Sequence, residues 1–230
     1  MAFEIYHPEW GLRPIRGVLF DMDGLVLDSE KLYTRFWREA AAAFGYQMSR
    51  EQALRMRAAN SRLSEANLHE FFGPGADYRQ IRAKRIELMD AHIAKHGVEP
   101  KPGIYELLDF LEENRIASAI TSSSPVDRIQ AHLGSLGLYH RFTQICSGYD
   151  VPNGKPAPDI YLKGAASLGL RPEECLALED APSGIRSAHD AGCFTVMIPD
   201  QDQPSEETKA LLHGKADSLA DIIDLLNTLQ

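Results

Sequence analysis

Two carboxylates, Asp21 and Asp23, directly follow the apolar run Val18-Leu19-Phe20 and precede Gly24. In an extended segment, residues i and i+2 point to the same side, so both carboxylates can face one pocket. Two close carboxylates repel each other unless a cation or a shared proton lies between them. A divalent cation with oxygen ligands, Mg²⁺ above all, suits carboxylates and a phosphate group, and a carboxylate can also serve as a covalent nucleophile. The spacing therefore indicates phosphoryl-transfer chemistry.

The pattern Asp-x-Asp-Gly also occurs in surface turns and in calcium-binding loops. A calcium loop needs glycine at its sixth position and an acidic residue at its twelfth. Counted from Asp21, Gly24 is fourth and the twelfth residue is Leu32, so the calcium loop is excluded. The apolar run before Asp21 argues against a plain surface turn, because it buries the approach to the carboxylates.

The composition is typical of a soluble globular protein. The chain has 230 residues, 44% of them hydrophobic and 25% charged, with a net charge of −9. This length allows one large domain or two smaller ones. The absence of a run of about 18 apolar residues argues against a membrane span, and the negative charge argues against nonspecific nucleic-acid binding. The N-terminus lacks a secretory signal, so we expect a cytoplasmic monomer or weak dimer with no nucleic-acid or membrane partner.

Three cysteines, Cys146, Cys175 and Cys193, are widely spaced along the chain. An odd number at such spacing favours buried thiols over a disulfide framework or a zinc site. Free thiols fit a reducing cytoplasm.

Short apolar runs that mostly alternate with helix-length segments predict a parallel sheet with helices on both faces. The predicted strands are Gly17–Phe20, Ile116–Thr121, Thr143–Cys146, Cys175–Leu178 and Phe194–Ile198. The gap between the first two strands, about 95 residues, is far longer than one crossover helix requires.

Within this gap, apolar residues recur at the spacing of helices. The predicted helices are Glu30–Phe44, Glu51–Ala59, Ser64–Phe72 and Tyr78–His96. We therefore predict a core domain of residues 1–28 and 101–230 and a helical cap domain of residues 29–100. The cap segment carries 12 Lys and Arg against 9 Asp and Glu, whereas the rest of the chain carries 12 against 24. A basic cap over an acidic metal site suits an anionic substrate; alternatively, these arginines only solvate helix faces.

Polar residues follow four of the predicted strands, at the end where ligands bind in an open parallel sheet. They are Asp21 and Asp23, then Thr121-Ser122-Ser123-Ser124-Pro125, then Gly154-Lys155-Pro156, and finally Glu179-Asp180. The serine hydroxyls and the backbone N–H groups after Pro125 suit a phosphate oxygen, although serines before proline are also common helix caps.

Lys155 and the acidic pair Glu179 and Asp180 supply opposite charges. Lys155 could balance a nucleophile and a phosphate, or it could be a solvated loop lysine. Pro156 excludes a Walker loop, which needs Ser or Thr after the lysine. Glu179 and Asp180 could complete a metal shell or favour the dipole of a helix N-terminus, but buried acidic pairs at a strand end are unusual without a cation.

Together these stretches resemble the haloacid dehalogenase-like superfamily of phosphatases and phosphomutases. The resemblance is closer to its subfamily I branch, which has a helical cap after the first strand and includes β-phosphoglucomutase and sugar-phosphate phosphatases. It spans nearly the whole chain, and four motifs occur in order. The serine motif is the less specific one, and the three highly specific stretches are Val-Leu-Phe-Asp-Met-Asp-Gly-Leu-Val-Leu-Asp-Ser-Glu, Gly-Lys-Pro-Ala-Pro-Asp-Ile-Tyr and Leu-Glu-Asp-Ala-Pro-Ser-Gly-Ile. It implies an α/β fold, with a doubly wound, Rossmann-like core and an inserted helical cap.

The resemblance also implies a role for each polar residue at the strand ends. Asp21 would be the nucleophile that forms an aspartyl-phosphate. Asp23 would protonate the leaving group and then activate water. Ser122, with Ser123 beside it, would bind the phosphate, and Lys155 would bridge the nucleophile and the phosphate.

The same resemblance implies a metal site and a specificity region. Mg²⁺ would be held by Asp21, the backbone carbonyl of Asp23, Asp180 and, through water, Glu179. Residues that by resemblance face the catalytic site from the cap are Arg57, Asn60 and Arg62, which suit a hydroxylated or doubly anionic substrate.

Three features separate the branches of the superfamily. Dehalogenases lack the second aspartate, so Asp23 favours phosphate chemistry. The mutase has a cap histidine where this chain has Tyr33, which weakens the mutase interpretation. A phosphonatase needs a Schiff-base lysine in the cap, and Lys31 is a candidate without an evident desolvating environment.

The sequence therefore predicts a Mg²⁺-dependent phosphatase of a small phosphorylated metabolite, a sugar or polyol phosphate. The alternatives are a β-phosphoglucomutase-type phosphomutase, a phosphonatase and a non-catalytic binding protein on the same scaffold.

Overall fold

The computed structural model describes the whole chain apart from residues 1–2, 11–13, 58–60, 201–202 and 230. The chain forms two compact units. One consists of Met1–Asp28 and Glu99–Gln230, and the other consists of Ser29–Val98.

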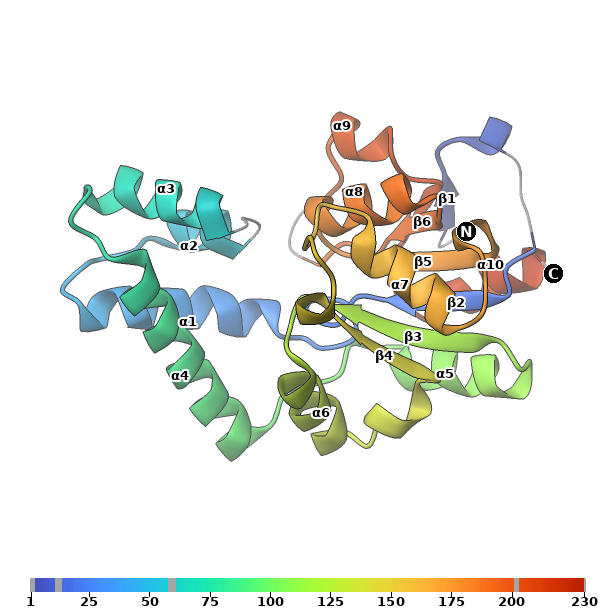
Figure 1. Ribbon diagram of the computed structural model, residues 1–230, viewed down its shortest axis with the longest axis horizontal. Helices are drawn as coiled ribbons and strands as arrows, with labels where there is room; N and C mark the ends of the chain where they lie inside the picture. Colours follow the sequence, from blue (N-terminus) through green and yellow to red (C-terminus); the bar gives the residue numbers. More distant parts are fainter. Residues whose placement is uncertain (1–2, 11–13, 58–60, 201–202, 230) are drawn as a thin grey trace. The chain divides into compact units, whose positions relative to one another are not determined.

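The larger unit contains a seven-stranded sheet with the order β1-β7-β6-β5-β2-β3-β4 (Figure 1). The strands are β1 (Phe3–Ile5), β2 (Gly17–Phe20), β3 (Ala117–Ser122), β4 (Gln144–Ser147), β5 (Cys175–Glu179), β6 (Phe194–Met197) and β7 (Gly214–Ala216). Neighbouring strands from β7 through β4 are parallel, and β1 is antiparallel to β7. The five predicted strands are therefore confirmed to within one residue or two at each end.

Helices flank this sheet in two groups (Figure 1). They are α5 (Ile104–Glu113), α6 (Val126–Ser135), α7 (Asp159–Ser167), α8 (Pro182–Ala191), α9 (Glu206–Lys209) and α10 (Asp221–Thr228). The connections through α5 and α6 lead from β2 to β4, whereas those through α7 and α8 lead back across the sheet to β6. Because such crossovers are right-handed, the two pairs lie on opposite faces. This arrangement confirms the doubly wound α/β fold.

Short 3₁₀ helices lie in the connections of the larger unit. They are η1 (Pro8–Trp10), η2 (Tyr139–Arg141), η3 (Gly148–Asp150) and η4 (Pro172–Glu174). None of the described helices combines the length and the apolar character that a membrane crossing requires.

The central strands are buried on both faces because helices cover both. Every residue of β2 and of β5 is buried, which explains why their sequences are continuous apolar runs rather than alternating ones. Cys146, Cys175 and Cys193 are all buried and free, so the predicted buried thiols are confirmed.

Two edge strands, β1 and β7, were not predicted. Phe3 pairs with Ala216 and Ile5 with Gly214. Each strand has only three residues, too few to show a periodic pattern in the sequence. The pairing attaches the N-terminal segment to the edge of the sheet.

The smaller unit is helical throughout its described secondary structure. Its helices are α1 (Glu30–Ala43), α2 (Arg50–Arg57), α3 (Ser61–Phe72) and α4 (Tyr78–His96). α1 packs against both α2 and α4, and a core that includes Trp37, Met56, Leu68 and Ile81 lies among the helices. This unit therefore has a hydrophobic core of its own.

Replacing Gly103 by alanine is expected to destabilise the larger unit more than an ordinary glycine replacement does. Gly103 has a φ of +88°, and a Cβ there would lie 2.5 Å from the backbone nitrogen of Ala220. The left-handed conformation costs about 1 to 2 kcal/mol for a residue with a Cβ, and overpacking adds about 1 to 3 kcal/mol. Urea unfolding measures the loss.

Gly169→Ala is the matched control for this substitution. Gly169 has a φ of +70° and open space where a Cβ would stand, so only the backbone strain applies. Equal losses in the two variants would contradict the predicted clash.

Candidate active site

Asp21 and Asp23 leave the carboxyl end of β2 at the centre of the sheet. The backbone N–H of Asp21 donates to the carbonyl of Leu178 on β5 at 3.1 Å, so the pairing of the sheet continues to the aspartate itself. Asp21 is only 8% exposed, whereas Asp23 is half-buried. Gly24 then turns the chain with a φ of +90°, a conformation that glycine adopts without a steric penalty.

A buried ion-pair network joins three of the predicted site residues. The Nζ of Lys155 lies 2.6 Å from Oδ1 of Asp21 and 2.6 Å from Oε1 of Glu179. The side chains of Lys155 and Glu179 are 8% and 1% exposed. Parallel pairing of β2 with β5 brings Asp21 and Glu179 to the same edge of the sheet, and the loop before α7 supplies the lysine between them.

The pKa values of Asp21 and Lys155 depend on burial and on the charges around each group. Burial raises the pKa of Asp21 to about 7, against the opposing effect of Lys155 and with a contribution from Glu179. Burial alone would lower the pKa of Lys155, but the two carboxylates outweigh it and hold that pKa above its ordinary value. The lysine is therefore charged.

Oxygen ligands for a cation gather at the same place. Carboxylate oxygens of Asp21, Glu179 and Asp180 lie within 4.8 Å of one another. Burial above all, with the neighbouring Glu179 carboxylate, raises the pKa of Asp21, so a further positive charge at this place would favour its ionised form. Clustered hard oxygen donors fit a divalent cation.

The serine loop after β3 contacts the other side of the Asp21–Asp23 turn. The hydroxyl of Ser124 donates to Oδ2 of Asp23 at 3.3 Å. Ser122 is buried, and its Oγ accepts a hydrogen bond from the backbone N–H of Ser124 at 3.1 Å. The Ser122 hydroxyl donates to no acceptor within the described part of the chain. Ser123 is exposed.

Three predicted site residues have no described side chain. Arg57, Asn60 and Arg62 lie outside the residues whose side chains the structure describes. Their predicted contacts with a substrate stay predictions.

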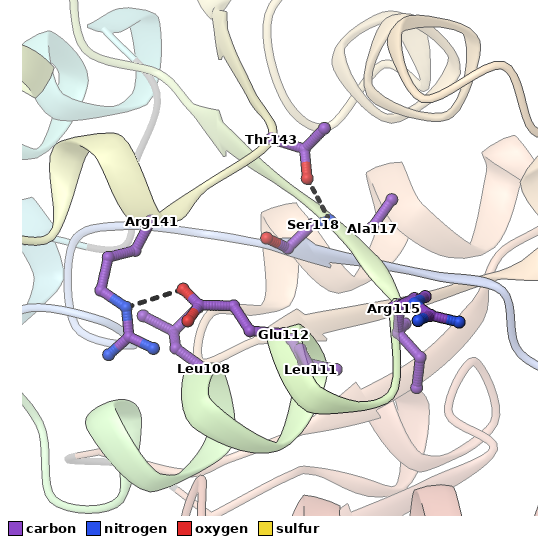
Figure 2. A pocket seen from close by; sticks show the side chains of 9 residues that line it. Leu108, Leu111, Glu112, Arg115, Ala117, Ser118, Arg141 and Thr143 are labelled. Carbon is purple, nitrogen blue, oxygen red and sulfur yellow. Dashed lines mark hydrogen bonds and ion pairs between the residues drawn. The ribbon is translucent and has the colours of Figure 1, made fainter.

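A pocket of the larger unit lies elsewhere (Figure 2). Its lining includes Leu108, Arg115, Ser118 and Arg141, around the start of β3. This is the opposite end of the strand from Ser122, so the pocket is not the candidate site. Some of its polar groups are paired with one another: Arg141 donates from Nε to Oε1 of Glu112 at 2.9 Å.

Two residues of the site, Tyr161 and Gly184, were assigned no role from the sequence, and Ser124 was considered only as one of several hydroxyl donors. Tyr161 donates its hydroxyl to Oε1 of Glu179 at 2.5 Å, Ser124 contacts Asp23, and Gly184 leaves room for the Glu179 carboxylate. A Cβ on Gly184 would lie 1.8 Å from Oε1 of Glu179. Tyr161 and Gly184 lie within the stretches that carry the resemblance, but their types alone indicate core packing and a helix glycine.

The metal-free protein is expected to lose stability as the pH rises through neutrality because of Asp21. Its pKa is about 7 in the folded protein against an ordinary value of 3.8, so the folded state holds this proton to a higher pH than the unfolded chain does. The stabilising contribution is complete below the unfolded value and is lost as the pH rises through about 7. Thermal unfolding in EDTA between pH 4.5 and 8.5 measures it.

Asp21→Asn removes this titration and serves as the reference. The difference in unfolding temperature between the variant and the wild type should shift in favour of the variant with rising pH. A difference that does not change with pH would refute the assignment.

Comparison with known proteins places this site in a family. The model for haloacid dehalogenase-like hydrolases matches residues 18–198. A Drosophila melanogaster protein named "Probable pseudouridine-5'-phosphatase" is 32% identical over 219 residues, which span 91% of this chain and 92% of that protein. Hexitol phosphatase A of Escherichia coli is 32% identical, over 86% of this chain and 91% of its own.

Solved structures agree with this placement. A variant of CbbY from Rhodobacter sphaeroides, in complex with xylulose-(1,5)bisphosphate, superposes with a TM-score of 0.74 at 25% identity. The match covers 90% of this chain and 96% of the other. With these motifs at the carboxyl ends of the parallel strands, the chain belongs to the haloacid dehalogenase-like hydrolase family.

Proposed function

We propose that this chain is a Mg²⁺-dependent phosphatase that hydrolyses a small phosphorylated metabolite through an aspartyl-phosphate on Asp21. The observation that carries the proposal is the buried contact of Lys155 with both Asp21 and Glu179, each at 2.6 Å. It places a fixed positive charge beside a carboxylate at the open end of a parallel sheet, where the substrate phosphate would meet both groups.

Asp21 and Asp23 divide the chemistry between them. One oxygen of Asp21 attacks the phosphorus atom, and the bond between phosphorus and the leaving oxygen breaks while Asp23 gives that oxygen a proton. Asp23 then takes a proton from the water that attacks the aspartyl-phosphate, which releases phosphate and restores Asp21. The hydrogen bond from Ser124 to Asp23 supports this assignment, because it holds the acid in place.

The charge that develops on the phosphoryl oxygens needs compensation. Lys155 supplies one positive charge, and the free donor of the Ser122 hydroxyl is suited to a phosphate oxygen. The residues that would hold Mg²⁺ are Asp21 and Asp180, the backbone carbonyl of Asp23, and Glu179 through water. When bound, the cation would neutralise phosphate charge and keep Asp21 ionised.

We propose that the unit of Met1–Asp28 and Glu99–Gln230 is a catalytic core and that the unit of Ser29–Val98 is a cap, within two residues of the predicted bounds. We assign substrate selection to the cap, through Arg57, Asn60 and Arg62, because the core residues recognise only the phosphate and the metal. Closure of a cap would exclude bulk water from the reaction.

The relatives point to the substrate class. One is named for a nucleoside 5'-phosphate and another for hexitol phosphates, and the solved relative holds a sugar bisphosphate. All three are phosphate esters of polyhydroxylated carbon chains or rings. We therefore assign this chain a sugar or polyol phosphate as substrate.

Phosphate release from a panel of sugar, polyol, nucleotide and glycolate phosphates tests the proposed function. Wild-type protein with Mg²⁺ should release phosphate from sugar or polyol phosphates, and EDTA should abolish the release. Asp21→Asn should lower kcat by at least about 1000-fold, because an amide cannot form the acyl phosphate.

Product analysis with a hexose 1-phosphate separates the phosphatase from the phosphomutase. Free phosphate supports the proposal. Conversion to hexose 6-phosphate in the presence of a bisphosphate primer would instead show that the protein is a phosphomutase. Failure to turn over any ester under either condition would reject both functions.

Arg62→Met tests substrate selection by the cap. A charge-assisted contact contributes about 1.5 to 3 kcal/mol, so kcat/KM for the preferred sugar phosphate should fall by about 10-fold or more. Activity on p-nitrophenyl phosphate, which lacks the hydroxyl groups, should stay unchanged. Arg79→Met, at an exposed position of α4, is the control. An equal loss on both substrates would show that Arg62 does not select.

A further inference from the structure

The hydroxyl of Tyr161 has no part in the proposed chemistry, yet it lies inside the ion-pair network. Tyr161 is fully buried, and its ring belongs to a core cluster that includes Leu19, Ala119 and Ala177. Its Oη lies 2.5 Å from Oε1 of Glu179 and 3.5 Å from Nζ of Lys155. Phenylalanine would fill the same core volume without placing a polar group there.

Glu179 receives two donors on one oxygen. Oε1 accepts from Nζ of Lys155 at 2.6 Å and from Oη of Tyr161 at 2.5 Å. A carboxylate oxygen offers about two lone-pair sites, so these donors use the capacity of Oε1. The oxygen left for a cation, or for a water bound to it, is Oε2.

Gly184 also lies against the carboxylate of Glu179. A Cβ there would lie 1.8 Å from Oε1 and 2.3 Å from Oε2 of Glu179, so the carboxylate lies directly against the backbone of α8. Glu179 is therefore held by the donors of Lys155 and Tyr161 and lies against the glycine surface of the helix.

We propose that Tyr161 is a positioning residue that, together with Lys155, holds Oε1 of Glu179 and so directs Oε2 to the divalent cation or to a water bound to it. The inference rests on the proposed function only in requiring a cation at Asp21, Glu179 and Asp180. It goes beyond that function by assigning a role to a side chain that touches neither substrate nor cation.

Calorimetric titration of the full-length protein with Mg²⁺ tests this role without reference to turnover. Tyr161→Phe removes one oxygen atom and should weaken Mg²⁺ binding by about 10-fold or more, as expected for loss of a group that orients a metal ligand. Tyr105→Phe is the matched control, because the hydroxyl of Tyr105 donates to the Leu136 carbonyl at the surface. Unchanged Mg²⁺ affinity in Tyr161→Phe would overturn the inference.

A double-mutant cycle separates positioning from a general effect on the fold. If Tyr161 acts through Glu179, Tyr161→Phe should change Mg²⁺ affinity by less than about 2-fold when Glu179 is already glutamine. An equal loss in both backgrounds would overturn the inference. Saturating Mg²⁺ should also restore kcat in Tyr161→Phe, which it would not do for a damaged core.

Two further variants keep the outcomes distinguishable. Asp180→Asn tests the cation site itself: if the wild type binds no Mg²⁺, or Asp180→Asn binds it as well as the wild type, the proposed function fails along with this inference. If Asp180→Asn loses binding and Tyr161→Phe does not, only this inference fails.

Gly184→Ala, which displaces the same carboxylate from the α8 side, should weaken Mg²⁺ binding, and normal affinity there would contradict the fixed position of Glu179.

Discussion

The rest of the site depends on the ammonium group of Lys155, which lies between the carboxylates of Asp21 and Glu179. Each of these charges would be expensive to bury alone, and breaking such a pair in a protein interior typically costs about 3 to 5 kcal/mol. The lysine therefore stabilises the fold around the site and also sets the charge state of the site. Beside it, carboxylate oxygens of Asp21, Glu179 and Asp180 gather at the place where we propose that a divalent cation binds.

The register of the sheet brings the carboxylates of Asp21 and Glu179 to the same level, where Lys155 can contact both. Phe20 pairs with Leu178 across β2 and β5, so the acidic residues that follow leave adjacent strands at the same level. Lys155 reaches them from the segment before α7, a helix that packs against β2, β3 and β4. Three segments far apart in the sequence thus supply one charged group each, and a slip of one residue in either strand would turn a carboxylate to the wrong face.

Much of this arrangement could be predicted from the chain. The central strands are apolar runs with reactive residues at their ends, and the rule that ligands bind at the carboxyl ends of parallel strands brings Asp21, Lys155 and Glu179 together before any coordinates are seen. Tyr161 could not be assigned a function in this way, because a tyrosine in a buried helix has the same sequence signature whether its hydroxyl matters or not. The edge strands β1 and β7 were not predicted for a different reason. Each has only three residues, which is too short to show an alternation of apolar and polar side chains.

The pairing of β1 with β7 has a consequence for the synthesis of the chain. Phe3 is synthesised 213 residues (216 minus 3) before its partner Ala216. At about 5 to 20 residues per second, the N-terminal strand waits roughly 10 to 40 s for the edge on which it lies in the native sheet. A strand that is made before the other six is therefore among the last to find its neighbour.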